Sequence, residues 1–375
     1  MTKIKAVEAM SVAYPEPNDG GSTRYLTLCR IEAKDGTTGW GESVPMSGSG
    51  FPEACKATEE VIRGLAALVI GREPTENRSL WHEIKARTWW YGPEGIAAFA
   101  LSAIDMALWD LRGKESGQSL TSMLGGTVRA SIPASAATIA TLTDLGAEAE
   151  RHGAIARAGF PGVKVAFTRR SGLGLDFDRD VEFMRLLREA VGPKTALMID
   201  RSHDLPWTPT DAIRVTRAME EHGLFWIEEP LEPHEIDGFK RLRNHVSALI
   251  ATGERQWNMR GYRELIQSGV VDVVGCDPGR AEGVTGFVQL VREVEAAGVW
   301  FNAHSWSSAI NTAASLAVSA SSERCLFFEL KPDENPMQHE LVEEPFYQKD
   351  GVVIPPVGPG LGVTVREDVV KRYRL

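Results

Sequence analysis

The 375-residue sequence has no apolar run approaching the ~20 residues that a helix needs to cross a bilayer. Its first ten residues, MTKIKAVEAM, lack the apolar core of a secretion signal. A formal charge of −10 lacks the positive excess of a nucleic-acid binder. Its few cysteines are far apart and form no Cys-x-x-Cys pair, so neither a zinc site nor a disulfide framework is expected. They are Cys29, Cys55, Cys276 and Cys325. We therefore expect a cytoplasmic, reduced protein that binds neither nucleic acid nor membrane.

The composition that remains is that of an ordinary globular chain, 43% hydrophobic and 25% charged. At about 100–200 residues per domain, the length predicts two domains, or one large barrel with an appendage. Residues 1–128 begin with three segments of strand composition and continue with three of helical periodicity. Strands followed by helices predict an α+β domain. The six segments are 3–12, 23–33, 38–42, 52–70, 77–87 and 95–113.

After Gly125 and Gly126 the pattern becomes a repeat of short apolar strand, loop, amphipathic helix and glycine. The helix starting near Thr208 illustrates it, because Thr208 can cap the helix and Pro209 suits the first helical position. Asp211 follows in the first turn, where the helix dipole favours negative charge. The strands are continuous apolar runs, as in parallel strands covered on both faces. The repeat predicts a parallel α/β sheet, open or closed, over residues 129–330.

A polar or charged residue stands where each of seven successive strands ends, at intervals of 36, 28, 26, 23, 27 and 25 residues. One such residue alone is usually a helix cap or a loop residue. Seven in register converge only if the sheet closes, and the carboxyl ends of the strands form the active-site rim of a (β/α)₈ barrel. We therefore predict a modified (β/α)₈ TIM-type barrel with an N-terminal α+β capping domain. The seven residues are Lys164, Asp200, Glu228, Glu254, Asp277, His304 and Glu329.

Several stretches of the sequence resemble the enolase superfamily, specifically its mandelate racemase subgroup. They are FWIEEP, TGER, DPGRAEGVTG and NAHSWSSAI, with SAIDMALWDLRGKESGQSLTSMLGG upstream. The resemblance covers nearly the whole chain. It implies that residues 331–375 return to complete the capping domain. It also implies a bound Mg²⁺ with Asp200, Glu228 and Glu254 as ligands, and oxygen ligands are what this cation prefers.

His304 is the predicted general base, and Asp277 can accept a hydrogen bond from one ring nitrogen and make the other more basic. A lone histidine on an apolar strand is more often a core residue, but the Asp277 partner and the resemblance favour a catalytic dyad. Glu329 matches the family position that hydrogen-bonds the developing enediolate, although a simple rim carboxylate is the alternative. Lys164 can supply positive charge to a substrate carboxylate, because three carboxylates and one divalent ion leave a net negative charge.

The second barrel strand separates the possible activities. The subgroup commonly has Lys-x-Lys there, with the second lysine acting as a base on the face opposite the histidine. Here the residues are Lys164, Val165 and Ala166, and alternation turns both Lys164 and Ala166 inward. Racemisation needs acid–base groups on both faces, whereas dehydration can proceed with one. The sequence therefore favours a dehydratase, in which Lys164 is either an acid–base group or an electrostatic one.

Substrate contacts are predicted from residues near the rim: Ser202, His203, Arg24 and Trp306. Two capping-domain loops, near residues 14–23 and 45–53, set substrate identity in this family, and Arg24 is the nearest cation for a second carboxylate. His203 could be an extra acid, but a supporting or solvated loop histidine is the favoured interpretation. The aromatic cluster Trp89, Trp90 and Tyr91 is expected to pack domain against domain.

The leading hypothesis is a Mg²⁺-dependent lyase that dehydrates a sugar acid, an aldonate or an aldarate, to a 2-keto-3-deoxy acid. A cycloisomerase, epimerase or racemase using the same enediolate is the enzymatic alternative. A barrel that binds a ligand without turnover is disfavoured, because every family position for the metal and the dyad holds a competent residue. The protein is also expected to form a homo-oligomer. The expected domains are 1–128, 129–330 and 331–375.

Overall fold

The computed structural model of the protein describes residues 2–45, 52–304 and 306–375. A three-stranded antiparallel sheet opens the chain in the order β1-β2-β3, and the predicted strand–helix order is confirmed. Strand β1 continues to Glu16, beyond the predicted end, because it is an edge strand and tolerates the missing N–H of Pro15. The elements are β1 (Ile4–Glu16), β2 (Ser22–Ala33), β3 (Thr38–Ser43), α1 (Glu53–Val69), α2 (Asn77–Thr88) and α3 (Ile96–Ser116).

The backbone of β3 lies very close to the backbone of α3, and the glycines of β3 make this close approach possible. A Cβ atom at Gly41 would lie 2.0 Å from the carbonyl oxygen of Ala103, and one at Gly39 would lie 2.2 Å from that of Ala107. Contacts this short would force the helix and the strand apart. The two glycines therefore fix how closely the sheet and the helix of this domain pack.

We expect Gly41→Ala to destabilise the protein by about 1–3 kcal/mol or more, because the added methyl group overpacks the β3–α3 contact. Urea unfolding followed by circular dichroism measures the loss. Gly64→Ala is the matched control, since nothing lies within 4 Å of a Cβ at Gly64 in α1. That change should stabilise by roughly 0.5–1 kcal/mol through helix propensity. Equal effects of the two substitutions would contradict the close-packing argument.

The second sheet is a closed barrel. Among the described residues, eight parallel strands follow one another in chain order, and pairing of β11 with β4 closes the ring. Its interior holds a buried cluster that includes Met198, Trp226 and Phe327. The predicted (β/α)₈ barrel is confirmed. The strands are β4 (Ile132–Ile139), β5 (Gly162–Phe167), β6 (Ala196–Arg201), β7 (Leu224–Glu228), β8 (Leu249–Thr252), β9 (Val273–Cys276), β10 (Trp300–Ala303) and β11 (Cys325–Leu330).

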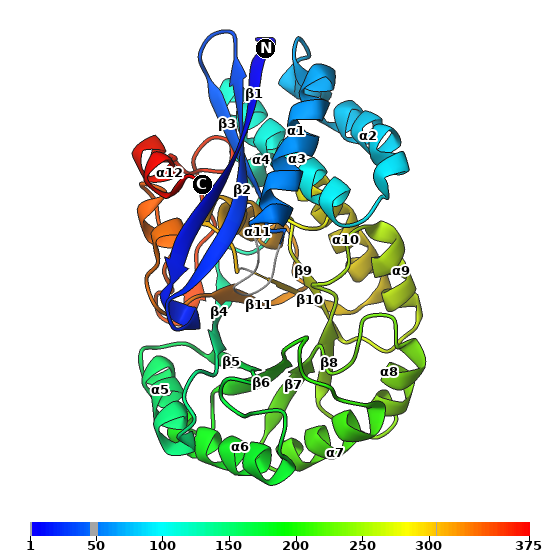
Figure 1. Ribbon diagram of the computed structural model, residues 1–375, viewed down its shortest axis with the longest axis vertical. Coiled ribbons are helices and arrows are strands. Elements are labelled where there is room, and N and C mark those ends of the chain that lie inside the picture. Colours follow the sequence, from blue (N-terminus) through cyan, green and yellow to red (C-terminus); the bar gives the residue numbers. More distant parts are fainter. Residues whose placement is uncertain (1, 46–51, 305) are drawn as a thin grey trace.

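Helices surround the barrel strands (Figure 1). Thr208 caps α7 and forms a capping box with Asp211, with Pro209 in the first turn, so the predicted helix start is confirmed. The short α4 (Leu120–Met123) links the capping domain to the barrel. The outer helices are α5 (Leu145–Arg157), α6 (Phe177–Val191), α7 (Pro209–Glu220), α8 (Ile236–Arg243), α9 (Met259–Gln267), α10 (Gly283–Ala297) and α11 (Ala309–Ser319). The single turns are η1 (Pro17–Asp19), η2 (Pro74–Glu76), η3 (Trp89–Tyr91) and η4 (Pro336–Glu340).

The C-terminal segment touches both parts of the molecule. Strand β12 (Val352–Val353) pairs antiparallel with β4 of the barrel. Helix α12 (Glu367–Tyr373) then lies against β1, and the N–H of Leu375 donates to the Ser11 carbonyl oxygen at 3.0 Å. The chain thus returns to the first sheet. The domain boundaries at 128 and 330 stay predictions.

Three further expectations concern the cysteines, membrane-spanning helices and the aromatic cluster at residues 89–91. All four cysteines lie in described residues and are free and buried. No helix within the described ranges is long and apolar enough to cross a membrane. The packing predicted for the aromatic cluster is wrong: Trp89, Trp90 and Tyr91 are 59%, 84% and 62% exposed. Helix α2 ends at Thr88, and the turn that follows carries these rings out to the surface.

Candidate active site

The seven polar residues at the strand ends meet at one end of the barrel. Asp200, Glu228 and Glu329 lie on the last or next-to-last residue of their strands, and Asp277 and His304 follow their strands directly. Glu254 lies two residues beyond β8, and Lys164 lies within β5 and not at its end as predicted. Side-chain contacts join them. Lys164 Nζ lies 2.5 Å from Glu228 and Glu329 and 3.6 Å from Asp200. His304 lies 2.8 Å from Asp277 and 3.3 Å from Glu254. The structure therefore brings all seven together.

The capping domain covers this end of the barrel. The N–H of Val44, just beyond β3, donates to the Gly279 carbonyl oxygen after β9, and Trp81 of α2 donates to the Glu282 carbonyl oxygen. On another side, Asp19 accepts a hydrogen bond from Arg170, which lies beyond β5. Figure 1 shows the long β1–β2 hairpin reaching from the capping sheet down beside the barrel.

Three carboxylates are grouped tightly enough to hold one cation. One oxygen from each of Asp200, Glu228 and Glu254 lies within 4.8 Å of the others. Burial and neighbouring carboxylates raise the pKa of Asp200 to about 7 and that of Glu228 well above its usual value. Trp226 Nε1 donates to the second oxygen of Glu228 at 3.0 Å and orients it. Crowded, buried carboxylates of this kind fit a divalent cation, which prefers oxygen ligands.

Lys164 is buried between these carboxylates and Glu329. Burial alone would lower its pKa, but Glu228, Glu329 and Asp200 outweigh that effect and hold the pKa well above the usual value. Its ammonium therefore supplies fixed positive charge at the site. Two residues further along β5, Ala166 stands where a second lysine would face the interior.

His304 and Asp277 form the predicted pair. His304 Nδ1 lies 2.8 Å from Asp277 Oδ2, and the ring and the carboxylate are both buried. The other oxygen, Oδ1, accepts hydrogen bonds from Asn311 Nδ2 at 2.9 Å and from the Gly279 N–H at 2.8 Å. Burial would raise the pKa of Asp277, but His304 and Arg280 hold it below its usual value. An ionised Asp277 keeps the proton on Nδ1 and leaves Nε2 as the base.

Glu329 has one satisfied oxygen and one free. Asn302 Nδ2 donates to Oε1 at 2.8 Å, and Lys164 contacts the same oxygen. The second oxygen, Oε2, is buried and has no hydrogen-bond partner in the part of the chain that the structure describes. Such an atom costs free energy unless a further group meets it. Sequence reasoning missed Asn302 and Asn311, although Asn311 follows the NAHSWSSAI stretch directly.

The predicted substrate contacts lie in different settings. Arg24 donates to Asp19 at 2.9 Å, and its guanidinium stacks on Trp306 at 4.8 Å from the ring centre. Ser202 is half-buried and His203 is exposed in the loop beyond β6. Of the predicted substrate loop at residues 45–53, residues 46–51 lie outside the described residues.

A buried lysine missed in the sequence lies near this group. Lys331, two residues beyond Glu329, contacts Glu16 Oε2 at 2.7 Å, and its ammonium lies 5.3 Å from the Trp306 ring centre. Both buried cations are thus paired with a buried carboxylate: Lys331 with Glu16, and Arg24 with Asp19, which also pairs with the more exposed Arg170. Lys331 directly follows β11 and lies two residues beyond Glu329.

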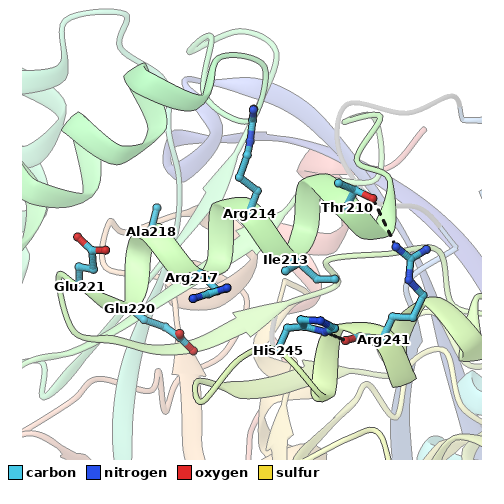
Figure 2. A pocket seen from close by; sticks show the side chains of 9 residues that line it. All are labelled: Thr210, Ile213, Arg214, Arg217, Ala218, Glu220, Glu221, Arg241 and His245. Atoms are coloured by element: carbon cyan, nitrogen blue, oxygen red, sulfur yellow. Dashed lines mark hydrogen bonds between the residues drawn. The ribbon is translucent and has the colours of Figure 1, made fainter.

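A wide surface groove is found elsewhere. It has a volume of about 830 Å³ and lies on the outer helices α7 and α8, between Arg214, Arg217, Arg241 and His245 (Figure 2). None of the seven strand-end residues lines it. The groove is therefore separate from the barrel mouth, where the acid–base and metal-type residues gather.

Two family models match the chain. Residues 144–369 match the model described as "Enolase C-terminal domain-like", and residues 19–125 match the "Mandelate racemase / muconate lactonizing enzyme, N-terminal domain". The first match alone covers more than half of the chain. The protein belongs to the enolase superfamily, in its mandelate racemase and muconate lactonizing enzyme group.

Individual relatives extend over nearly the whole chain. A D-galactarolactone cycloisomerase of Agrobacterium fabrum is 30% identical, covering 94% of this chain and 92% of the relative. A D-gluconate dehydratase of Thermoproteus tenax is 28% identical, covering 100% and 74%. A mandelate racemase/muconate lactonizing protein of Paracoccus denitrificans, solved complexed with magnesium, is 29% identical with a TM-score of 0.86, covering 100% and 97%. Relatives named for both reaction types therefore match nearly the whole of this chain.

Proposed function

We propose that the protein is a Mg²⁺-dependent dehydratase that converts an aldonate to its 2-keto-3-deoxy acid. The observation that carries this proposal is a base on one face only: His304 has its Asp277 partner, and Ala166 occupies the second-base position on β5. One-sided proton chemistry suits elimination of water and not racemisation. The name of the D-gluconate dehydratase relative supports an aldonate substrate.

In this mechanism His304 Nε2 removes the proton α to the substrate carboxylate, and the C–H electron pair forms the C=C bond of an enediolate. The enediolate then re-forms the carboxylate, and its C=C electron pair moves to make a double bond between the α- and β-carbons. The β-hydroxyl leaves with the electrons of its C–O bond and takes the proton from the His304 imidazolium, so that water departs. Ketonisation of the resulting enol gives the 2-keto-3-deoxy acid. Lys164 holds positive charge beside the substrate carboxylate, and Glu329 hydrogen-bonds the enediolate.

Asp200, Glu228 and Glu254 would hold the Mg²⁺. When bound, the cation makes the α-proton more acidic by stabilising the negative charge that develops on the carboxylate.

Product analysis decides between dehydration and the cycloisomerase alternative, which the 30% identical relative favours. Incubation with a panel of aldonates, followed by NMR and mass spectrometry, should show loss of one water and a 3-deoxy methylene signal. Turnover of lactones or anhydro acids with unchanged mass, and none of open-chain aldonates, would contradict the dehydratase proposal and support a cycloisomerase.

The substrate is proposed to carry one carboxylate, as in an aldonate, and not two, as in an aldarate. Two buried cations near the reacting groups, Arg24 and Lys331, are already paired with the carboxylates of Asp19 and Glu16. A second carboxylate at that end would have to displace a buried carboxylate or lie beside it, and like charges in a dry site repel. Hydroxyl groups can bind beside such ion pairs without that cost.

We expect kcat/KM to be larger for D-gluconate or D-galactonate than for the corresponding aldarate, by about tenfold or more. The second carboxylate of an aldarate would disturb one of these charge-assisted hydrogen bonds, and such a bond contributes ~1.5–3 kcal/mol. Glu16→Gln should lower the ratio of kcat/KM for the aldonate to kcat/KM for the aldarate, because Lys331 can then pair with the second carboxylate. Steady-state kinetics with matched pairs of mono- and diacids measure both quantities. Glu60→Gln, on the exposed surface of α1, is the control and should leave the ratio unchanged. A wild-type preference for diacids would refute the proposal.

A further inference from the structure

Glu42, on β3 of the capping domain, holds the start of a barrel helix. Its side chain is fully buried. Oε1 accepts the N–H of Ser308 at 2.8 Å, and Oε2 accepts the Ser308 hydroxyl and the N–H of Asn311 at 3.2 Å. Ser308 is the N-cap of α11. A carboxylate at this place satisfies N–H groups that the helix leaves free, and it complements the positive end of the helix dipole.

Helix α11 in turn contacts the catalytic pair. Asn311, whose N–H binds Glu42, donates from its side chain to Asp277 Oδ1 at 2.9 Å and to the Ser307 hydroxyl at 2.9 Å. Asp277 Oδ2 lies 2.8 Å from His304 Nδ1. An unbroken series of hydrogen bonds therefore runs from the capping domain, through Asn311 and Asp277, to the base.

We propose that Glu42 is a positioning residue: by fixing the first turn of α11, it holds Asn311 and Asp277 in place and so sets the orientation of His304. The proposal rests on the roles assigned to His304 and Asp277 in the proposed function. It gives the capping domain a part in catalysis besides covering the substrate. A misplacement of the base by about 1 Å can cost on the order of 100-fold in rate.

The surroundings of Glu42 act in opposite directions on the pKa of its carboxyl group. Burial raises the pKa of Glu42 to about 7, while hydrogen bonds from Ser308 and Asn311 favour the ionised form. The titratable groups that act on it or feel its charge are Asp277, Tyr14 and Lys331. Glutamine at this position would turn an NH₂ group toward N–H donors and lose part of this anchoring.

The same domain provides a matched control. Asp105 of α3 is also buried, and burial raises its pKa to about 7 as well. It accepts the N–H of Thr285 at 2.8 Å and the Thr285 hydroxyl at 2.7 Å, at the start of α10. Among the described residues, the side chain of Thr285 hydrogen-bonds Asp105 and Trp109 and neither His304 nor Asp277. Asp105→Asn therefore loosens a similar inter-domain contact that has no side-chain hydrogen bond to the pair.

The first test compares Glu42→Gln and Asp105→Asn in the full-length, Mg²⁺-loaded enzyme. Glu42→Gln should lower kcat by on the order of 10–100-fold with little change in KM, because positioning of the base is lost and substrate binding is kept. Asp105→Asn should lower only the melting temperature. Glu42→Asp, which keeps the charge, should recover part of kcat. An equal fall of kcat in Asp105→Asn and Glu42→Gln would overturn the proposal.

A double-mutant cycle tests whether Glu42 acts on His304 through Asn311. If Glu42 acts through Asn311, Glu42→Gln combined with Asn311→Ala should lose little more than the worse single variant, whereas combination with Asp105→Asn should be additive. Additive losses for Glu42→Gln and Asn311→Ala would overturn the route. Should Glu42→Gln fail to fold, Ser308→Ala, which removes one donor to the carboxylate, takes its place in the cycle.

A spectroscopic measurement needs no substrate, so it separates this inference from the proposed function. The proton on His304 Nδ1, assigned by its loss in His304→Asn, should appear far downfield because it is shared with Asp277. Glu42→Gln should shift or broaden this signal, and Asp105→Asn should not. An unchanged signal in Glu42→Gln refutes positioning, even if the enzyme proves to be a cycloisomerase. A shifted signal supports it, whatever the substrate is.

Discussion

Replacing His304 with asparagine should abolish both turnover and exchange of the substrate α-proton with solvent deuterium. Removal of a general base typically costs ~10²–10⁴-fold in rate. The loss here should reach or exceed the upper end, because Ala166 on β5 offers no base on the opposite face. Proton NMR in D₂O follows exchange at the α-carbon, and a coupled assay for the 2-keto acid follows turnover.

Two companion variants sharpen the His304 result. Asp277→Asn should cost less, because it disturbs the tautomer and basicity of His304 without deleting the base. Lys164→Met should slow turnover through lost charge at the substrate carboxylate, yet leave exchange detectable. Near-normal exchange in His304→Asn together with none in Lys164→Met would reverse the roles and make Lys164 the base.

Removal of any one carboxylate of the acidic triad should abolish turnover and weaken Mg²⁺ binding. Asp200→Asn, Glu228→Gln and Glu254→Gln each remove one of three oxygen ligands that lie within 4.8 Å of one another. The loss of affinity should exceed the ~10–100-fold that follows from losing an outer-shell partner of a metal ligand. Isothermal titration with Mg²⁺ measures it, and chelation of the wild-type enzyme should give the same inactive state.

The metal-free proteins provide the control for this prediction. In the absence of the ion, Asp200→Asn should leave the melting temperature unchanged or raise it, because burial and neighbouring carboxylates already raise the pKa of Asp200 to about 7. Wild type should gain stability on addition of Mg²⁺, and the variant should gain less. Unchanged Mg²⁺ affinity in all three variants would rule out this triad as the metal site.

Much of the fold could be predicted because the strand–helix repeat is encoded by residues that are close together in the sequence. Thr208, Pro209 and Asp211 mark the start of α7 by capping chemistry alone. Spacing of the strand-end residues then indicated a closed sheet. The aromatic cluster at Trp89 was predicted wrongly, since apolar character does not reveal whether a short turn faces the partner domain or solvent.

The site was predictable where one strand end carries one functional side chain, as with Asp200 or His304. It was not predictable where function depends on contacts between distant segments. Glu42 and Asn311 are 269 residues apart, and neither stands in a pattern that marks a pair. Similarly, the pairing of Lys331 with Glu16 could not be foreseen, so the sequence left aldonate and aldarate equally open.

The return of the C-terminus to the first sheet has a consequence for biosynthesis. Strand β1 is at the sheet edge, and Arg374 and Leu375 cover part of that edge through contacts to Val12 and Ser11. Since a chain is made from its N-terminus, β1 emerges from the ribosome long before the segment at Arg374 and Leu375 that covers its edge. The nascent protein therefore carries an open strand edge, the kind of surface that invites wrong pairing, until Arg374 and Leu375 have been made.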